Sequence, residues 1–540
     1  MAIAMDFGTC NTVFVRWNHA TRQAELVDIP KLTRRFPYRL PDRPKELTAS
    51  VVPTLIHYGE KGSPPLGEQV ATDGLVDHQG TFRWLKLDLL KGNDKGKNIH
   101  GIKRTPRQAA TYFVTDTLTF ALGALGGGAN EELVITVPVE AEDGYVDWLR
   151  RTVESVAGGR RVQVLDEATA CILGYQETVK NDDVYAIADF GGGTFDFSIV
   201  RVNLGAEGLK KCLIRGRAGE ELGGMLVDHW MLERMKAAEK LSDADIREVG
   251  TPLLRGIEEA KIKLSRGAPG AEAGWTNDLT GLVISHTFTP GELREVLERH
   301  DFFKLVARTV DRALQAADDK YKVKKRDIQR VFLVGGTSLL LGVRELMGSL
   351  FPDRPVEFGK PFEAIAAGAC RYAGQDFDPT LVHDYAVESW NPELKEFELV
   401  TVIEKGTQYP TNGAIKGKYL SAACDQADEL KMVVYELTEI VRPGTTLVMG
   451  PDGRMMEQQT GTARVERRRP LNPEAEDFLR PNPPCDRDET KRFVVGFGVN
   501  ENKCLTISVK DTRPGNRSKV RASDGRFIDL PIRNEPLVRL

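Results

Sequence analysis

Cysteine is scarce in this chain, and its spacing carries no motif. Only seven cysteines occur among 540 residues, and no two of them form a CxxC pair. An odd, scattered set in a large chain argues against a disulfide framework and against a zinc site. We therefore expect free thiols in a reducing compartment.

Long apolar runs and an excess of one charge are also missing. No stretch reaches the roughly 18 apolar residues of a membrane-spanning helix, and the first residues, MAIAMDFGTC, lack the basic and apolar segments of a secretion signal. Lysine and arginine total 74 against 78 aspartates and glutamates, a net charge of −4. This balance argues against a generally basic, nucleic-acid-binding surface. The expectation is a cytoplasmic protein with no membrane and no nucleic-acid partner.

The chain does have the composition of a folded protein, with 41% hydrophobic and 28% charged residues. Apolar, strand-like runs alternate with helical periodicity as far as Tyr372, which predicts an α/β domain at 1–372. After Gly374 short strands predominate, which predicts an all-β domain at 385–540 behind a linker at 373–384.

Two polar segments interrupt these patterns. Residues 448–490 are rich in proline and contain a basic run at 464–469, so we predict a mobile insertion. Residues 31–45 are basic and contain proline, which favours a solvated surface loop over a contact for an acidic partner.

Three glycine-rich turns each follow an apolar run: DFGT at 6–9, DFGGGTFD at 189–196 and GGT at 335–337. Glycine allows close approach of a ligand, and successive backbone N–H groups with threonine hydroxyls can cradle phosphate. Asp6 and Asp189 could then hold Mg²⁺ through its waters. One such turn alone is better explained as a tight turn, but two aspartate-containing turns favour two similar lobes around a nucleotide.

Five segments together resemble the DnaK-type, 70-kDa heat-shock chaperones of the actin-like ATPase superfamily. IAMDFGTCNT, IADFGGGTFDFSI and VFLVGGTSLL are similar to the two phosphate motifs and the adenosine motif. VITVP followed by VLDEATACILGY, and KPFEAIAAGA, are similar to the helices that connect the lobes. The resemblance implies a two-lobed α/β ATPase over about residues 1–372. It further implies ATP and Mg²⁺ as cofactors, and a J-domain co-chaperone and an exchange factor as partners.

The resemblance also assigns roles to individual residues. Asp6 and Asp189 would lie beside hydrated Mg²⁺, Glu167 would orient water or metal, and Pro138 would end the lobe-coupling strand. Asp6, Glu167, Asp189 and Thr194 form the expected catalytic set. The expected nucleotide-binding residues are Gly8, Thr9, Cys10, Gly191, Gly192, Gly193, Glu258, Lys261, Ser265, Gly335 and Gly336. For Glu258 and Lys261, an exposed helix pair is the alternative.

Several positions depart from the family pattern. Cys10 stands where the family has a threonine, and Ile262 and Leu339 stand where two arginines sandwich the adenine. The family's catalytic lysine aligns with Ala71. Lys86 is the nearest substitute, although we interpret it as an ordinary surface lysine. Slow hydrolysis is therefore expected.

The second domain is similar to the β-sandwich that holds extended peptides in this family. The residues expected to line the peptide groove are Val387, Trp390, Leu420, Ala423, Leu430 and Met432. An extended peptide would add main-chain hydrogen bonds, with an apolar pocket selecting its side chain; the alternative is plain sandwich core. The chain ends 29 residues after Asp511 (540 − 511), with three prolines there, so no C-terminal helical lid is expected.

These observations predict a chaperone-like ATPase that couples ATP hydrolysis to binding of unfolded or extended polypeptide. The alternative is a slow or inactive ATPase that acts as a nucleotide-gated scaffold for one protein partner. An actin-like filament former is less favoured because the second domain resembles a peptide clamp. A sugar kinase is least favoured because no sugar-site motif is found.

Overall fold

The computed structural model describes residues 2–536 apart from 19, 22, 41–45, 77, 126–131, 140, 176–177, 206–207, 277–282, 374–380, 382, 392–395, 412, 421, 423, 450–454, 473–476, 501–503, 514, 516, 523–525 and 531. Contacts divide the chain into two compact units. Unit 1 comprises Met1–Pro138 and Arg151–Asp376, and unit 2 comprises Val139–Arg150 and Phe377–Leu540. Among the described residues, no helix is long and apolar enough to cross a membrane.

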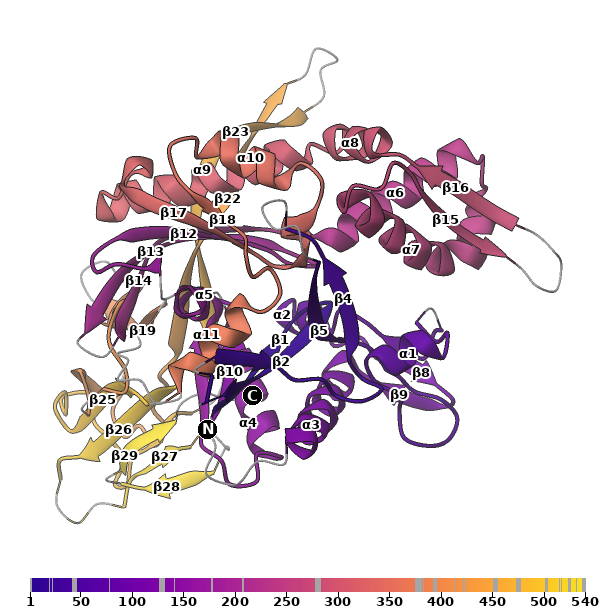
Figure 1. Cartoon of the computed structure of the whole chain (residues 1–540). Coiled ribbons are helices and arrows are strands. Elements are labelled where there is room, and N and C mark those ends of the chain that lie inside the picture. Colours follow the sequence, from indigo (N-terminus) through magenta and orange to yellow (C-terminus); the bar gives the residue numbers. More distant parts are fainter. Residues whose placement is uncertain are drawn as a thin grey trace. The chain divides into compact units, whose positions relative to one another are not determined.

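Unit 1 contains two mixed β-sheets (Figure 1). The strands of the first sheet are β1 (Ala2–Phe7), β2 (Asn11–Asn18), β3 (Gln23–Leu26), β4 (Arg34–Tyr38), β5 (Leu47–Pro53), β10 (Glu132–Val137) and β11 (Val162–Asp166), in the order β11-β10-β1-β2-β5-β4 with β3 beside β2. The strands of the second are β12 (Val184–Phe190), β13 (Phe195–Gly205), β14 (Gly208–Glu220), β17 (Ile328–Val334) and β18 (Val356–Glu357), in the order β14-β13-β12-β17-β18.

The two sheets repeat one arrangement around a glycine turn. In the first, β1 pairs with β2 as an antiparallel hairpin and with β10 in parallel. In the second, β12 pairs with β13 as an antiparallel hairpin and with β17 in parallel. Apolar side chains of both hairpins are fully buried, which explains their continuous hydrophobic runs. The two predicted aspartate turns therefore occupy equivalent places in two similar lobes.

Helices and short strands complete unit 1. The helices are α1 (Glu68–Thr72), α2 (Leu85–Leu90), α3 (Pro106–Leu125), α5 (Glu167–Gly174), α6 (Gly224–Ala238), α7 (Asp243–Ser265), α8 (Pro290–Arg299), α9 (Phe302–Tyr321), α10 (Val343–Leu350) and α11 (Ala364–Tyr372), and α4 (Asp143–Glu154) is divided between the units. The short strands pair as β6 (Ile56–His57) with β7 (Thr81–Phe82), β8 (Lys97–Ile99) with β9 (Ile102–Arg104), and β15 (Ala271–Thr276) with β16 (Val283–Phe288).

The two helices expected to connect the lobes, α5 and α11, pack directly against each other (Figure 1). A Cβ at Gly368 would lie 1.7 Å from the carbonyl oxygen of Ala170, and a Cβ at Gly174 would lie 2.2 Å from that of Ala364. Each helix thus supplies a glycine where the backbone of the other approaches. The close crossing explains why small residues dominate both segments.

The described residues of unit 2 from Asp384 onward form strands and no helix. One sheet has the order β20-β19-β22-β23, and a second has the order β21-β25-β26-β29. The bounds are β19 (Asp384–Asn391), β20 (Glu396–Ile403), β21 (Lys416–Leu420), β22 (Val434–Met449), β23 (Met455–Pro470), β25 (Phe493–Val499), β26 (Leu505–Asp511) and β29 (Ile532–Pro536), with β24 (Leu479–Arg480), β27 (Lys519–Arg521) and β28 (Phe527–Asp529) in a third sheet. Both four-stranded sheets contribute to one hydrophobic core.

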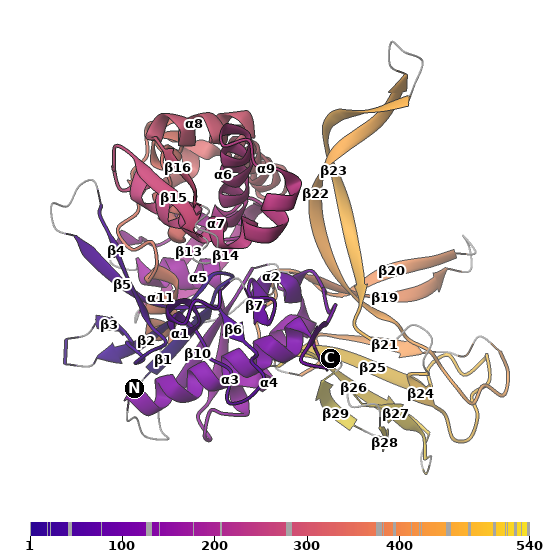
Figure 2. The same cartoon turned by 90° about the vertical axis from the view of Figure 1, so that its right-hand side faces the viewer.

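The prediction of a mobile insertion at 448–490 is wrong for its described part. The basic run 464–469 lies in β23, which pairs with β22 in a long antiparallel hairpin. Further on, Leu471, Phe478 and Cys485 are buried in the core of unit 2. Within the described part of this hairpin, Val434–Leu437 pair with β19, and the hairpin continues past the other strands of the unit (Figure 2). Pro470 is tolerated because it ends β23, which is an edge strand.

Candidate nucleotide site

Three carboxylates meet beneath the glycine turns of unit 1. Asp6 lies near the end of β1, Asp189 near the end of β12, and Glu167 opens α5. Burial is the main cause that raises the pKa of Asp6 to about 6, and repulsion from Glu167 is the second. The charge of Lys86 and a 2.7 Å hydrogen bond from Thr136 Oγ1 act in the opposite direction. Burial and repulsion from Glu167, Asp196 and Asp6 raise the pKa of Asp189 well above its usual value. The cluster is therefore short of positive charge.

Lys86 supplies the positive charge of this cluster, so its interpretation as a surface lysine is wrong. Its side chain is only 9% exposed, and Nζ lies 2.6 Å from Oε1 of Glu167, whose side chain is 16% exposed. Its charge also lowers the pKa of both Asp6 and Asp189. Ala71, at the aligned lysine position, lies instead in α1, where its carbonyl accepts a hydrogen bond from Arg255.

The first two glycine turns face each other. An added Cβ at Gly192 would lie 2.2 Å from Sγ of Cys10, and one at Gly193 would lie 3.3 Å from Cγ2 of Thr9. Gly192 is therefore required where the loop of one lobe approaches the loop of the other. Burial raises the pKa of the Cys10 thiol to about 12, so it behaves as a neutral side chain here.

Backbone carbonyl groups of both turns accept hydrogen bonds from residues outside the turns. The Thr54 hydroxyl donates to the Gly8 carbonyl oxygen at 2.9 Å. The Thr54 backbone N–H donates to the Cys10 carbonyl oxygen at 2.8 Å. Thr337 Oγ1 donates to the Gly191 carbonyl at 2.8 Å, and the N–H of Met225 donates to that of Gly192 at 3.0 Å.

Part of the N–H groups of the same turns remains open, although the N–H of Gly191 donates to the carbonyl oxygen of Thr194 at 2.9 Å. Within the described part of the chain, the backbone N–H groups of Thr9, Cys10, Gly192 and Gly193 have no protein acceptor. Successive N–H groups of this kind, on two opposed loops, form a concave site for an anion.

The third glycine turn packs on the second carboxylate. Gly335 has a φ of 80°, and an added Cβ would lie 2.6 Å from Oδ1 of Asp189 and 2.2 Å from the carbonyl oxygen of Phe190. Both the left-handed backbone and the close approach require glycine. The structure thus brings all three predicted turns to one place.

A cavity of about 370 Å³ extends from these turns. It is lined by Thr9, Cys10 and Gly192 at the turns, and by Glu258, Lys261, Ile262, Ser265, Gly336 and Leu339 from α7 and the third turn. Residues predicted to contact adenosine therefore converge with the anion site. Asp6, Glu167, Asp189 and Thr194 do not line this cavity; Asp6 and Asp189 lie at the strand ends that lead into its turns.

Lys261 is not half of an exposed helix pair. Its side chain is 12% exposed, and Nζ lies 2.7 Å from Oδ1 of Asp228 and 2.9 Å from the carbonyl oxygen of Gly224. Burial raises the pKa of Asp228 to about 7, while Lys261 acts in the opposite direction. Nearby, Ser265 Oγ is buried without a hydrogen-bond partner among the described residues. Asp228 was missed because a single carboxylate inside a helix gives no sequence signal.

The basic segment 31–45 is also not simply a solvated loop. Residues 34–38 form β4, and Arg34, Phe36, Tyr38 and Arg39 line the same cavity. Residues 41–45 lie outside the described residues.

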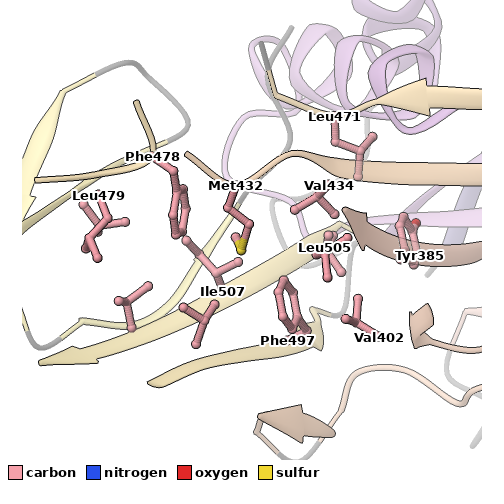
Figure 3. Close-up of a cluster of buried hydrophobic side chains, with 14 of the residues drawn as sticks. Tyr385, Val402, Met432, Val434, Leu471, Phe478, Leu479, Phe497, Leu505 and Ile507 are labelled. Carbon is pink, nitrogen blue, oxygen red and sulfur yellow. The ribbon is translucent and has the colours of Figure 1, made fainter. Parts of the chain in front are cut away.

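The described residues that were predicted to line a peptide groove lie in or against the hydrophobic core of unit 2. Val387, Leu430 and Met432 are buried in the hydrophobic core, and Leu420 packs against that core. Figure 3 shows Met432 among the buried side chains of this core. This placement fits the plain-core alternative for these residues better than an open groove. Ala423 and the side chain of Trp390 lie outside the described residues.

Two lobes built on the same hairpin, with opposed glycine turns and buried carboxylates, are the architecture of the actin-like fold. Comparison with known proteins identifies the family. The family model described as Hsp70 protein matches residues 92–442, and the chain belongs to the Hsp70 family. The family implies the two-lobed, actin-like ATPase fold, and its members are chaperone-type ATPases.

One relative is a chaperone protein DnaK from Deinococcus deserti. It is 24% identical over 446 residues, which cover 80% of this chain and 64% of the relative. The chain therefore spans somewhat less than two thirds of the length of this curated relative.

Proposed function

We propose that this protein is a chaperone-type ATPase that binds Mg·ATP between the two lobes of unit 1 and hydrolyses it slowly. The observation that carries the proposal is a pair of opposed turns with four N–H groups that have no protein acceptor among the described residues, next to three carboxylates that share the charge of Lys86. The family supports ATP as the nucleotide. A triphosphate would satisfy the N–H groups of both loops at once.

The carboxylates fit a hydrated Mg²⁺ ion. Among the described residues, no three His, Cys, Asp or Glu side chains are placed to bind a metal directly, and Mg²⁺ commonly keeps several of its waters. Burial, and then repulsion from neighbouring carboxylates, raises the pKa of Asp6 and Asp189, so a divalent cation beside them would stabilise their charged forms. Bound there, the ion would neutralise charge on the phosphates.

Protein side chains would supply the remaining catalytic parts. Lys86 would place positive charge at the phosphate end, replacing the lysine absent at position 71, and Glu167 would orient the attacking water. Thr194 would hold a phosphate oxygen. Because Lys86 is also needed to balance Glu167, only part of its charge acts on the phosphates, which is a physical reason for slow turnover.

The proposal extends to coupling with unit 2. Nucleotide-dependent closure of the lobes would shift how unit 2 holds an extended polypeptide, as a population shift between two arrangements. A J-domain co-chaperone and an exchange factor are the partners that this function would use. Family membership supports this part of the proposal.

Single-turnover hydrolysis tests the function. The wild-type protein should hydrolyse Mg·ATP slowly, and extended peptides should accelerate it. Asp189→Asn should abolish turnover, while substitution at the exposed Arg35 should not. Binding of ATP with no hydrolysis in any condition would instead favour the nucleotide-gated scaffold.

A further inference from the structure

The strand β4 presents one face to the nucleotide cavity. Side chains alternate along a strand, and the cavity is lined by Arg34, Phe36 and Tyr38 but not by Arg35 or Pro37. The opposite face is solvated: the side chain of Arg35 is 75% exposed and pairs with Asp28. The alternation therefore separates a cavity face from a solvent face on one short edge strand.

The cavity face of β4 joins the third glycine turn through an aromatic cluster. The ring centroid of Phe362 lies 5.0 Å from that of Phe36 and 5.5 Å from that of Tyr38. Tyr38 is buried and its hydroxyl donates to Glu363 Oε1 at 3.2 Å, which fixes the strand. An added Cβ at Gly336 would lie 3.0 Å from Phe362, so the cluster adjoins the glycine expected beside the ribose.

Arg34 is the charged member of this face. It lines the cavity and its backbone pairs with Val51 of β5, while its side chain has no hydrogen bond or ion pair with any residue that the structure describes. A guanidinium group can stack on a planar aromatic base and attract anions. In the family pattern two arginines sandwich the base. Here those two positions carry Ile262 and Leu339, which line the same cavity and cannot supply a cation.

We propose that β4 is a nucleotide-specificity element, in which Arg34 and Phe36 contact the sugar and base of the bound nucleotide. This inference rests on the proposed function, since it assumes that the cavity holds a nucleotide. Among the arginines that line the cavity, Arg34 shares one strand face with Phe36 and can supply a cation that positions 262 and 339 lack. Phe36, backed by Phe362, supplies an aromatic wall.

Calorimetry with two ligands tests the inference. Arg34→Gln and Phe36→Leu should each weaken Mg·ATP binding by about threefold to tenfold, the usual worth of one stacking contact. Neither should change the affinity for Mg·tripolyphosphate, which has the phosphates but no sugar or base. Arg35→Gln, on the solvent face of the same strand, is the matched control and should bind both ligands as the wild type does.

The two ligands also separate the possible failures. If the variants bind Mg·ATP as tightly as the wild type, the role of β4 is overturned while nucleotide binding stands. If they lose both ligands equally, β4 acts by supporting the fold, and the specificity role is again overturned. If the wild-type protein binds neither ligand, the proposed function fails and the inference falls with it.

Discussion

Replacing Lys86 should damage both stability and turnover. The perturbation is Lys86→Met, which keeps most of the side-chain volume and removes the charge. Lys86 and Glu167 have side chains only 9% and 16% exposed and lie 2.6 Å apart. Removing one partner of a buried pair typically costs about 3–5 kcal/mol because the remaining charge is left uncompensated. We expect a loss near the lower end, about 3 kcal/mol, because hydration of the site offsets part of the cost.

The effect on turnover follows from the same geometry. Loss of a positioned positive charge at a phosphoryl-transfer site commonly lowers the rate by about 100-fold or more. Single-turnover hydrolysis and denaturant unfolding would be measured on the same samples. Lys91→Met is the matched control, because Lys91 follows the same helix but is 44% exposed and pairs with the exposed Glu221.

A double variant separates charge balance from catalysis. Lys86→Met with Glu167→Gln leaves no unpaired carboxylate from this pair, so it should recover part of the stability without recovering turnover. The reasoning is refuted if Lys86→Met behaves like Lys91→Met in both assays. It is refuted for stability alone if the double variant is no more stable than Lys86→Met.

Three further predictions concern other parts of the chain. At pH 8 a thiol with a pKa of about 12 is only about one part in 10⁴ ionised, so Cys10 should be alkylated far more slowly than the exposed Cys424. The alkylation rate of Cys10 should still rise with pH beyond 10. Peptide mapping by mass spectrometry checks this, and rapid labelling of Cys10 would contradict it. Met432→Ala should lower the unfolding free energy of unit 2 by about 2–5 kcal/mol in urea titrations, whereas a groove position would leave it unchanged. Gly368→Ala should greatly destabilise unit 1 in thermal unfolding, because its Cβ would lie 1.7 Å from the Ala170 carbonyl oxygen; unchanged stability would show that the helices can separate.

Local sequence patterns were sufficient for the framework of unit 1. The apolar runs that precede the three glycine turns form the strands β1, β12 and β17, because buried apolar runs bounded by glycine turns leave few alternatives. Close backbone approach explains the glycines at three positions of unit 1. An added Cβ at Gly174, Gly335 or Gly368 would lie 2.2 Å or less from a carbonyl oxygen of another segment.

Features that depend on tertiary packing could not be read from the chain. Lys86 looked like a surface residue because its burial comes from contacts with Glu167, 81 residues away in sequence. Residues 34–38 were assigned to a loop because the strand that they pair with, β5, cannot be inferred from their own composition. In unit 2, groove and core both require alternating apolar side chains, so the sequence alone could not place Met432.

Calorimetric titration of the intact protein with ATP, with and without Mg²⁺, tests the central claim most directly. The account predicts saturable binding of one ATP per chain, strengthened by Mg²⁺, and clear weakening of the Mg²⁺-dependent part by Asp189→Asn. Absence of ATP binding, or an ATP affinity that neither Mg²⁺ nor Asp189→Asn alters, would contradict it.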